Sequence, residues 1–234
     1  MKNFINIADI DKKDLRKIID HAKLQKVKRS KLDKSATDPN APLIDKTLIM
    51  IFEKASTRTR LSFELAMNQL GGKVLVLNTK ESHYGSGDES VHDTANILSQ
   101  YGDIVMMRTS KHKHFLEFSK NLDIPIINGL TNLSHPCQIM SDIMTFEELK
   151  GPIKNKKIAW LGDCNNIVYS LIEAAVKFNF QLSIACPKKL RPDQKIINWA
   201  KNHKAKILIT NNPNEAATSA DCVMTDKWVS MGDI

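Results

Sequence analysis

Short apolar runs alternate with amphipathic segments through most of the chain, and this alternation constrains the fold more than any other feature. A short run of aliphatic residues is typical of a buried strand, whereas apolar residues recurring every three to four positions are typical of a helix. Strands that alternate with helices form parallel sheets covered by helices. We therefore predict an α/β protein with two doubly wound parallel-sheet domains. The predicted strands are 48–51, 74–77, 104–107 and 124–127 in the first domain, and 157–161, 182–185, 206–209 and 222–224 in the second.

Helices are predicted between these strands, after a first helix that begins near Asp11 and runs to about Lys31. The others are 57–70, 89–100, 112–121, 136–150, 167–178 and 193–202. Gly71, Gly102 and Asn121 are predicted to end three of the helices, because glycine and asparagine tolerate the left-handed backbone conformation of many helix ends.

The dipeptide Gly151-Pro152 interrupts the chain after the predicted helix 136–150. Such a dipeptide breaks regular structure, so we predict a domain of residues 1–150 followed by one of residues 151–234. The sequence stops at Ile234 directly after a loop, without a closing helix or strand. The second domain is therefore expected to be incomplete at its C-terminus.

Composition narrows the class of protein and its compartment. The four cysteines form no C-x-x-C pair, which argues against a zinc ribbon and a disulfide framework. No apolar run reaches the ~20 residues that span a bilayer, and the N-terminus has no signal-peptide core, so we expect a cytoplasmic protein without membrane contact. The formal net charge is +8, but the densest basic run, residues 23–34, has no interleaved aromatic residues. We interpret it as a solvated helix face and expect no nucleic-acid partner.

The segment 56–60, with the sequence Ser-Thr-Arg-Thr-Arg, lies where the first predicted strand meets its helix. The first N–H groups of a helix lack backbone partners and lie at the positive end of its dipole, so they favour anions. Ser56, Thr57 and Thr59 add hydroxyl donors. Arg58 and Arg60 add planar guanidinium groups that match phosphate oxygens and are unfavourable at this helix end without an anion. We interpret the segment as a phosphate cradle.

Further polar residues follow other strands of the predicted first sheet. Arg108 ends the run 104–107 and should emerge at the same edge, so three guanidinium groups are expected to converge there with those of Arg58 and Arg60. His135 and Gln138 follow the fourth strand and can donate hydrogen bonds to a carbonyl oxygen. A histidine ahead of a helix is also common as a cap or core residue.

Four segments, in this order, closely resemble the motifs of ornithine carbamoyltransferases. They are Ser56-Thr57-Arg58-Thr59-Arg60, Arg108, His135-Pro136-Cys137-Gln138 and Asp226-Lys227-Trp228-Val229-Ser230-Met231-Gly232. The resemblance covers nearly the whole chain. It implies a two-domain α/β fold, a homotrimer or higher homo-oligomer with sites between subunits, and carbamoyl transfer from carbamoyl phosphate to L-ornithine. The products would be L-citrulline and phosphate, in arginine biosynthesis or catabolism, and no metal or cofactor is implied.

The resemblance also assigns residues to the two substrates. Those expected to bind carbamoyl phosphate are Ser56, Thr57, Arg58, Thr59, His83, Arg108, His135 and Gln138. Among these, Arg58, Arg108, His135 and Gln138 would be catalytic. Those expected to bind ornithine are Asn166, Asp226, Ser230 and Met231. In this assignment Asp226 pairs with the α-ammonium group, and His83 lies on a loop that reaches into a neighbouring subunit's site.

Two departures from the family pattern leave alternatives open. The loop that carries His83 is one residue longer, and the family's His-Cys-Leu-Pro segment and last helix are absent. The alternatives are a non-catalytic carbamoyl phosphate-binding or oligomerisation remnant, and a transferase for putrescine or another amine. Aspartate carbamoyltransferase is disfavoured because that family carries threonine at the position of Cys137 and lacks the loop 230–232. A dinucleotide site near Gly162 is disfavoured because the second and third glycines of its motif are missing.

Overall fold

The computed structural model describes residues 3–78 and 89–226, which form two compact units. Unit 1 comprises Met1–Ile5 and Asp20–Asn132, and unit 2 comprises Asn6–Ile19 and Leu133–Ile234. Each unit contains a four-stranded parallel sheet, which confirms the predicted α/β class. The domain boundary after residue 150 stays a prediction.

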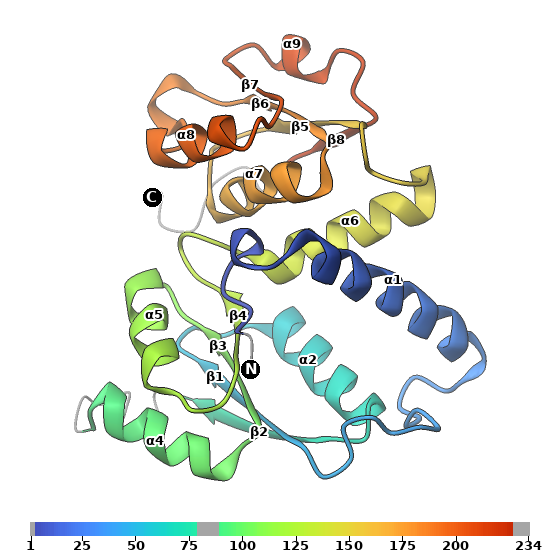
Figure 1. The fold of residues 1–234 in the computed structure, drawn as a ribbon, viewed down its shortest axis with the longest axis vertical. Coiled ribbons are helices and arrows are strands. Elements are labelled where there is room, and N and C mark those ends of the chain that lie inside the picture. The colour runs from blue at the N-terminus through green and yellow to red at the C-terminus, as the bar shows by residue number, and fades with distance from the viewer. Residues whose placement is uncertain (1–2, 79–88, 227–234) are drawn as a thin grey trace. The chain divides into compact units, whose positions relative to one another are not determined.

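The sheet of unit 1 has the strand order β2-β1-β3-β4 (Figure 1). Its strands are β1 (Thr47–Phe52), β2 (Lys73–Asn78), β3 (Ile104–Arg108) and β4 (Ile126–Leu130). Its helices include α2 (Thr57–Gln69), α4 (Val91–Tyr101) and α5 (His112–Asn121). The chain adds β2 on one side of β1 and then returns to add β3 on the other, so the direction of winding switches between β1 and β3.

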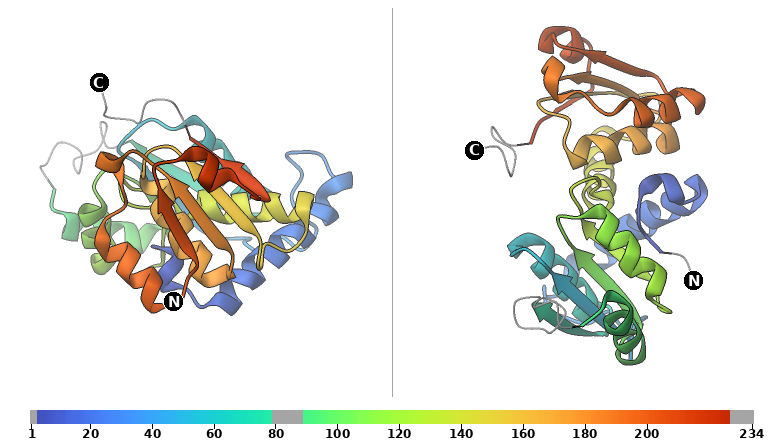
Figure 2. Two further views of the ribbon diagram at one scale, coloured as in Figure 1. Left: turned by 90° about the horizontal axis from the view of Figure 1, so that it is seen from above. Right: turned by 90° about the vertical axis from the view of Figure 1, so that its left-hand side faces the viewer.

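Alternate residues of β1 enter two separate cores, as the two-residue period of a strand requires. Ile49 and Ile51 pack in a cluster with residues of α4 and α5, including Phe115 and Phe118. The intervening residues Leu48, Met50 and Phe52 pack in a cluster with Met67 of α2. The views in Figure 2 likewise show helices on both faces of the sheet. The continuous apolar run of β1 is therefore explained by burial on both faces.

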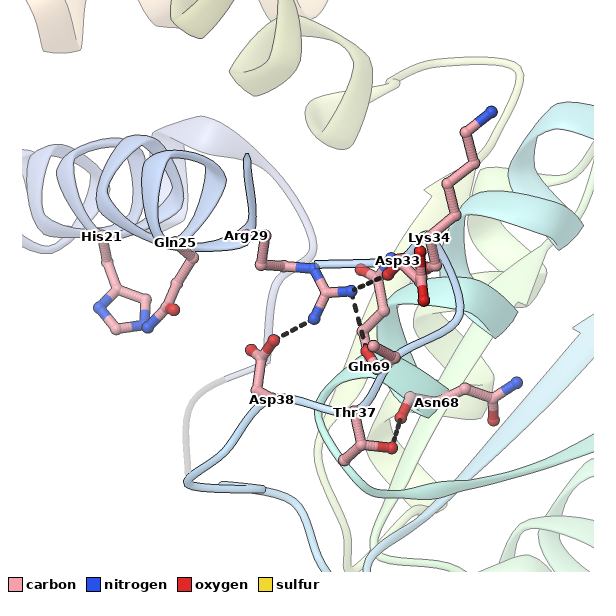
Figure 3. Close-up of polar contacts among 10 residues, drawn as sticks. His21, Gln25, Arg29, Asp33, Lys34, Thr37, Asp38, Asn68 and Gln69 are labelled. Carbon is pink, nitrogen blue, oxygen red and sulfur yellow. Dashed lines mark hydrogen bonds and ion pairs between the residues drawn. The ribbon is translucent and has the colours of Figure 1, made fainter. Parts of the chain in front are cut away.

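Arg29 holds the polar loop before β1 in place (Figure 3). Its guanidinium group forms an ion pair with Asp38, and its Nη2 donates to the carbonyl oxygen of Ala36 at 2.9 Å. Asp38 is only 5% exposed, and its backbone N–H donates to the carbonyl oxygen of Gln69 at 2.6 Å. Gln69 in turn donates through Nε2 to the carbonyl oxygen of Lys34 at 2.7 Å. The loop is thus tied to the last turn of α2.

The first helix is shorter than predicted. The α-helix α1 covers Lys12–Lys28 and continues as the 3-10 helix η2 (Arg29–Lys31). A second 3-10 helix, η1 (Ile7–Asp9), precedes α1 and was not predicted, because three residues are too few for a periodic pattern.

The sheet of unit 2 has the strand order β7-β6-β5-β8. Its strands are β5 (Lys157–Leu161), β6 (Gln181–Ala185), β7 (Ile207–Thr210) and β8 (Cys222–Met224). Its helices include α6 (Pro136–Lys150), α7 (Asn166–Phe178), α8 (Gln194–Asn202), the short α9 (Pro213–Ala217) and the 3-10 helix η4 (Lys188–Leu190). The chain places β6 and β7 on one side of β5 and returns to place β8 on the other, so the winding switches between β5 and β8.

Glu173 of α7 is a buried acid that holds the segment η1 within unit 2. It is 8% exposed, and its Oε2 accepts the backbone N–H of Ala8 at 3.1 Å. The pKa of Glu173 is raised to about 7. Burial is the main cause and the negative charge of Asp9 adds to the rise, while hydrogen bonds from backbone N–H groups and the nearby Lys177 oppose it. Lys177 itself donates to the carbonyl oxygen of Ile10 at 2.7 Å.

Most predicted elements are confirmed within a residue or two, and the differences have local causes. The strand predicted at 124–127 begins at Ile126 and runs to Leu130. Gly71 has the expected left-handed backbone (φ 86°), but Gly102 is extended (φ −126°) and Asn121 is the last residue of α5. Among the described residues, no helix is long and apolar enough to cross a membrane.

Candidate functional site

Each sheet presents one position where a ligand is expected from topology alone. In open parallel sheets, ligands bind beyond the carboxyl ends of the strands, where the winding changes direction. In unit 1 this position lies between the ends of β1 and β3. In unit 2 it lies between the ends of β5 and β8.

The segment after β1 forms the N-terminus of α2, as predicted. Ser56 is the residue before the first turn, and its side chain makes no capping hydrogen bond. By contrast, the side chains of Ser90, Asn165 and Asp193 each accept a backbone N–H at the starts of α4, α7 and α8. A capping hydroxyl normally satisfies one of the free amides of the first turn. The side chain of Ser56 therefore does not occupy the first amides of α2, and the starts of α5 and α6 likewise have no side-chain cap.

Arg108 ends β3 beside this helix start. Its position opposite Phe52 of β1 is set by the register of the sheet, and its Nη1 donates to Oγ1 of Thr59 at 2.8 Å. The Nε atom of Arg108 is buried and has no hydrogen-bond partner among the described residues. Burial lowers the pKa of Arg108, and the positive charge of nearby Arg58 lowers it further. Two neighbouring cations with an unsatisfied donor favour an anion at this edge.

The expected convergence of three guanidinium groups is only partly correct. Arg58 lies close enough to Arg108 to affect its pKa, but Arg60 lies along the surface of α2. Its Nε atom is 3.6 Å from Oε2 of Glu64, one helical turn further on, and its side chain is 52% exposed. Arg60 therefore belongs to an i,i+4 ion pair on the helix surface.

A hydrogen-bonded cluster at the same edge was missed by the sequence interpretation. The carboxylate of Glu53 accepts the hydroxyl of Thr109, and its Oε1 lies 2.9 Å from Nδ1 of His114. Nearby, Nδ1 of His112 lies 2.9 Å from Oγ1 of Thr131. Glu53 directly follows β1, but Thr109 and His114 are 56 and 61 residues away in the sequence. No local pattern could have joined them.

His135 and Gln138 both lie at the start of α6, in unit 2. His135 directly precedes the helix, and its backbone N–H donates to Oγ of the buried Ser170 of α7 at 2.9 Å. Gln138 is exposed and donates through Nε2 to Oδ1 of Asp142 at 2.8 Å. Burial raises the pKa of Asp142, while the hydrogen bond from Gln138 lowers it. These contacts fix the helix start and orient the Gln138 amide.

Cys137 lies between these two residues but is not an activated nucleophile. Burial raises the pKa of its thiol to about 12. A reactive cysteine needs a thiolate that forms near neutral pH. This supports a packing or positioning role for Cys137 and argues against a reaction in which its thiolate is the nucleophile.

In unit 2 the structure brings the loops after β5 and β8 together at the switch point. Asn165 accepts the N–H of Ile167 through Oδ1 and donates through Nδ2 to Oδ2 of Asp226 at 2.9 Å. Asn166 is the next residue and begins α7. The sequence interpretation named Asn166 and Asp226 but missed Asn165, which links the two loops. Asp226 is exposed and so keeps a carboxylate oxygen accessible to solvent.

Three of the predicted site residues, His83, Ser230 and Met231, lie outside the described residues. Within residues 3–78 and 89–226, no group of three or more His, Cys, Asp or Glu side chains is placed to hold a metal ion. The switch point of unit 1 has hydroxyl donors and guanidinium groups, and that of unit 2 has side-chain amides and one exposed carboxylate. Such a set can bind anions and orient polar groups.

Comparison with known proteins identifies the family. Residues 2–148 match the carbamoyl-P binding domain of aspartate/ornithine carbamoyltransferases, and residues 154–234 match their Asp/Orn binding domain. The chain therefore belongs to the aspartate/ornithine carbamoyltransferase family.

Ornithine carbamoyltransferases are among the similar proteins of this family. The sequence is 46% identical to the ornithine carbamoyltransferase of Mesorhizobium japonicum, over 99% of this chain and 75% of the relative. It is 47% identical to that of Rhodopseudomonas palustris, over 99% of this chain and 73% of the relative. The solved structure of the Pyrococcus furiosus enzyme matches with a TM-score of 0.91 at 38% identity, over 99% of this chain and 73% of that chain. The chain thus spans about three quarters of the length of these relatives.

Proposed function

We propose that this protein transfers the carbamoyl group of carbamoyl phosphate to the δ-amine of L-ornithine, producing L-citrulline and phosphate. The observation that carries the donor half of the proposal is Arg108, which lies beside Arg58 at the switch point of unit 1 and whose buried Nε has no partner in residues 3–78 and 89–226. The family membership and the names of the relatives support the acceptor.

In this proposal the phosphate of the donor binds to Arg58, Arg108, Thr59 and the free amides at the start of α2. Guanidinium groups form paired hydrogen bonds with phosphate oxygens and stabilise the charge that grows on the departing phosphate. Ser56 and Thr57 add hydroxyl donors. His83, from a neighbouring subunit, completes the set that the family resemblance assigns.

The carbonyl group of the donor is assigned to His135 and Gln138, whose hydrogen bonds stabilise the oxyanion of the tetrahedral intermediate. The neutral δ-amine attacks the carbonyl carbon, the bond to the phosphate oxygen breaks, and the proton lost by the amine passes to phosphate or solvent. Carbamoyl phosphate is a reactive mixed anhydride, so holding the two substrates in line supplies much of the rate enhancement.

The acceptor is assigned to the switch point of unit 2. There the exposed carboxylate of Asp226 pairs with the α-ammonium group of ornithine, and Asn166 donates to its carboxylate. Ser230 and Met231 belong to the same proposed site. The hydrogen bond from Nδ2 of Asn165 to Oδ2 of Asp226, at 2.9 Å, would help to orient the carboxylate for this role.

We further propose that the protein acts in the cytoplasm, in arginine metabolism, as a homotrimer or higher homo-oligomer without a cofactor. The family resemblance supports these points. Size-exclusion chromatography with light scattering measures the oligomeric state directly, and a trimer is the expected result.

The test of the proposed reaction is an acceptor panel. Purified protein is mixed with carbamoyl phosphate and ornithine, putrescine or aspartate, and each carbamoylated product is measured together with released phosphate. Citrulline and phosphate in equal amounts, with ornithine strongly preferred, support the proposal. Product from putrescine or aspartate instead of ornithine would identify that compound as the acceptor and overturn the proposed reaction. Donor binding without any product would indicate a non-catalytic carbamoyl phosphate-binding protein.

A further inference from the structure

The end of β3 is irregular at the residue that the proposed function depends on. Met107 pairs with Asn128 of β4, but Arg108 pairs with Leu130, so β4 carries one extra residue at this point. Bulges of this kind change the direction of a neighbouring side chain and occur often beside functional sites. The direction of the Arg108 side chain therefore depends on what holds the backbone around the bulge.

Glu53 holds the backbone on the C-terminal side of Arg108. Its own N–H donates to the carbonyl oxygen of Arg108 at 3.0 Å. Its carboxylate accepts the hydroxyl of Thr109, the next residue, which is 1% exposed. The N–H of Thr109 donates to the carbonyl oxygen of Leu130 at 3.0 Å, so the same peptide unit is also tied to β4.

The second carboxylate oxygen of Glu53 joins this strand end to α5. Its distance to Nδ1 of His114 is 2.9 Å, and the hydroxyl of Thr109 accepts the N–H of Lys111 at 3.1 Å. Both oxygens of Glu53 are thus engaged by groups other than Arg108. The Arg108 guanidinium group keeps its contact with Thr59, and its buried Nε has no partner within the part of the chain that the structure describes.

We propose that Glu53 is a positioning residue that aims Arg108 at the phosphate of the donor without touching the donor itself. This inference rests on the proposed function, because it assigns the anion bound by Arg108. A carboxylate so close to an anion site is unfavourable unless other groups engage its oxygens, and Thr109 and His114 do so for Glu53.

A similar contact elsewhere in the chain provides a matched control. In unit 2, the hydroxyl of Thr210 at the end of β7 donates to the carboxylate of Glu215, and the N–H of Asn212 donates to that hydroxyl at 3.1 Å. No proposed site residue lies in the loop between β7 and α9. Loss of the Glu215 contact should therefore affect local stability without affecting donor binding.

The experiment measures the dissociation constant of carbamoyl phosphate by titration calorimetry for the whole chain. The variants are Glu53→Ala, Arg108→Lys, the double variant and Glu215→Ala. If Glu53 acts through Arg108, Glu53→Ala weakens binding about tenfold, the equivalent of one good hydrogen bond. The double variant then binds no more weakly than Arg108→Lys alone, because the position of a replaced guanidinium group no longer matters.

Two further variants separate positioning from folding. Glu53→Gln keeps an oxygen for the Thr109 hydroxyl and should restore most of the affinity. Thr109→Val removes the same hydrogen bond from the other partner and should reproduce the loss even if Glu53→Ala does not fold. Full affinity in Thr109→Val, or additive losses in the double variant, would overturn the role of Glu53. Absence of carbamoyl phosphate binding by the unchanged protein would instead overturn the proposed function, and this inference with it.

Discussion

The buried carboxyl group of Glu173 gives the protein a specific dependence of stability on pH. Its pKa is raised from the ordinary value of 4.5 to about 7, mainly by burial. The folded state therefore binds the proton more tightly than the unfolded state does. Between these two values the free energy of unfolding must fall as pH rises, because deprotonation leaves a charge buried beneath η1.

The size of the effect follows from the two pKa values. At about 1.4 kcal/mol per unit of pKa, the complete change is about 3 kcal/mol, and most of it falls between pH 5 and pH 8. Glu173→Gln keeps an oxygen for the N–H of Ala8 but cannot ionise. We expect the stability of the variant relative to the unchanged protein to increase by about 2 to 3 kcal/mol from pH 5 to pH 8.

Urea unfolding at the two pH values measures this difference. All three tryptophans, Trp160, Trp199 and Trp228, lie after residue 133, so their fluorescence reports on unit 2, where Glu173 lies. The exposed Glu148, changed to Gln, is the control and should give the same difference at both pH values. A stability difference for Glu173→Gln that does not change with pH, or that falls as pH rises, would refute the reasoning.

Three other substitutions test the site and the fold. Arg58→Lys should weaken carbamoyl phosphate binding about tenfold by calorimetry, because a bidentate guanidinium contact is lost, whereas Arg60→Lys should have little effect. Asp226→Asn should raise the KM for ornithine and leave donor binding unchanged, as measured by steady-state kinetics and calorimetry. Asp38→Ala should lower the free energy of unfolding of unit 1 by about 3 kcal/mol in circular-dichroism urea titrations, because it leaves the charge of Arg29 without its buried partner.

Each of these substitutions has a result that would contradict its reasoning. Equal losses in Arg58→Lys and Arg60→Lys would mean that the cradle does not discriminate between the two arginines. Loss of donor and acceptor binding together in Asp226→Asn would indicate a folding defect in place of a lost contact. An unchanged unfolding midpoint in Asp38→Ala would show that the loop before β1 is not held by the Arg29 ion pair.

Elements with clear ends could be predicted from the sequence, and short or non-local features could not. The helices α5 and α6 have the predicted bounds, and Pro136 marks the start of α6. The strand β4 was placed two residues early because the apolar run around Pro125 continues across its start. The five-residue helix α9 was missed because it is too short to show a period.

The candidate site shows the same division between local and non-local information. The position of Arg108 at the edge shared with α2 follows from the parallel direction of the strands, which the alternation of strands and helices already implies. The engagement of Arg60 by Glu64 could have been read from the i,i+4 spacing, but the two arginines look equivalent in a motif. The role of Glu53 depends on residues more than 50 positions away and required the structure.

The most direct test of the central claim is hydrogen–deuterium exchange of the whole chain with and without carbamoyl phosphate, resolved by peptide mass spectrometry. The proposed site requires new protection in the peptides that cover the start of α2 and the end of β3, around Arg58 and Arg108. New protection in those peptides would support an anion site between β1 and β3. Protection elsewhere only, or none at saturating carbamoyl phosphate, would contradict it.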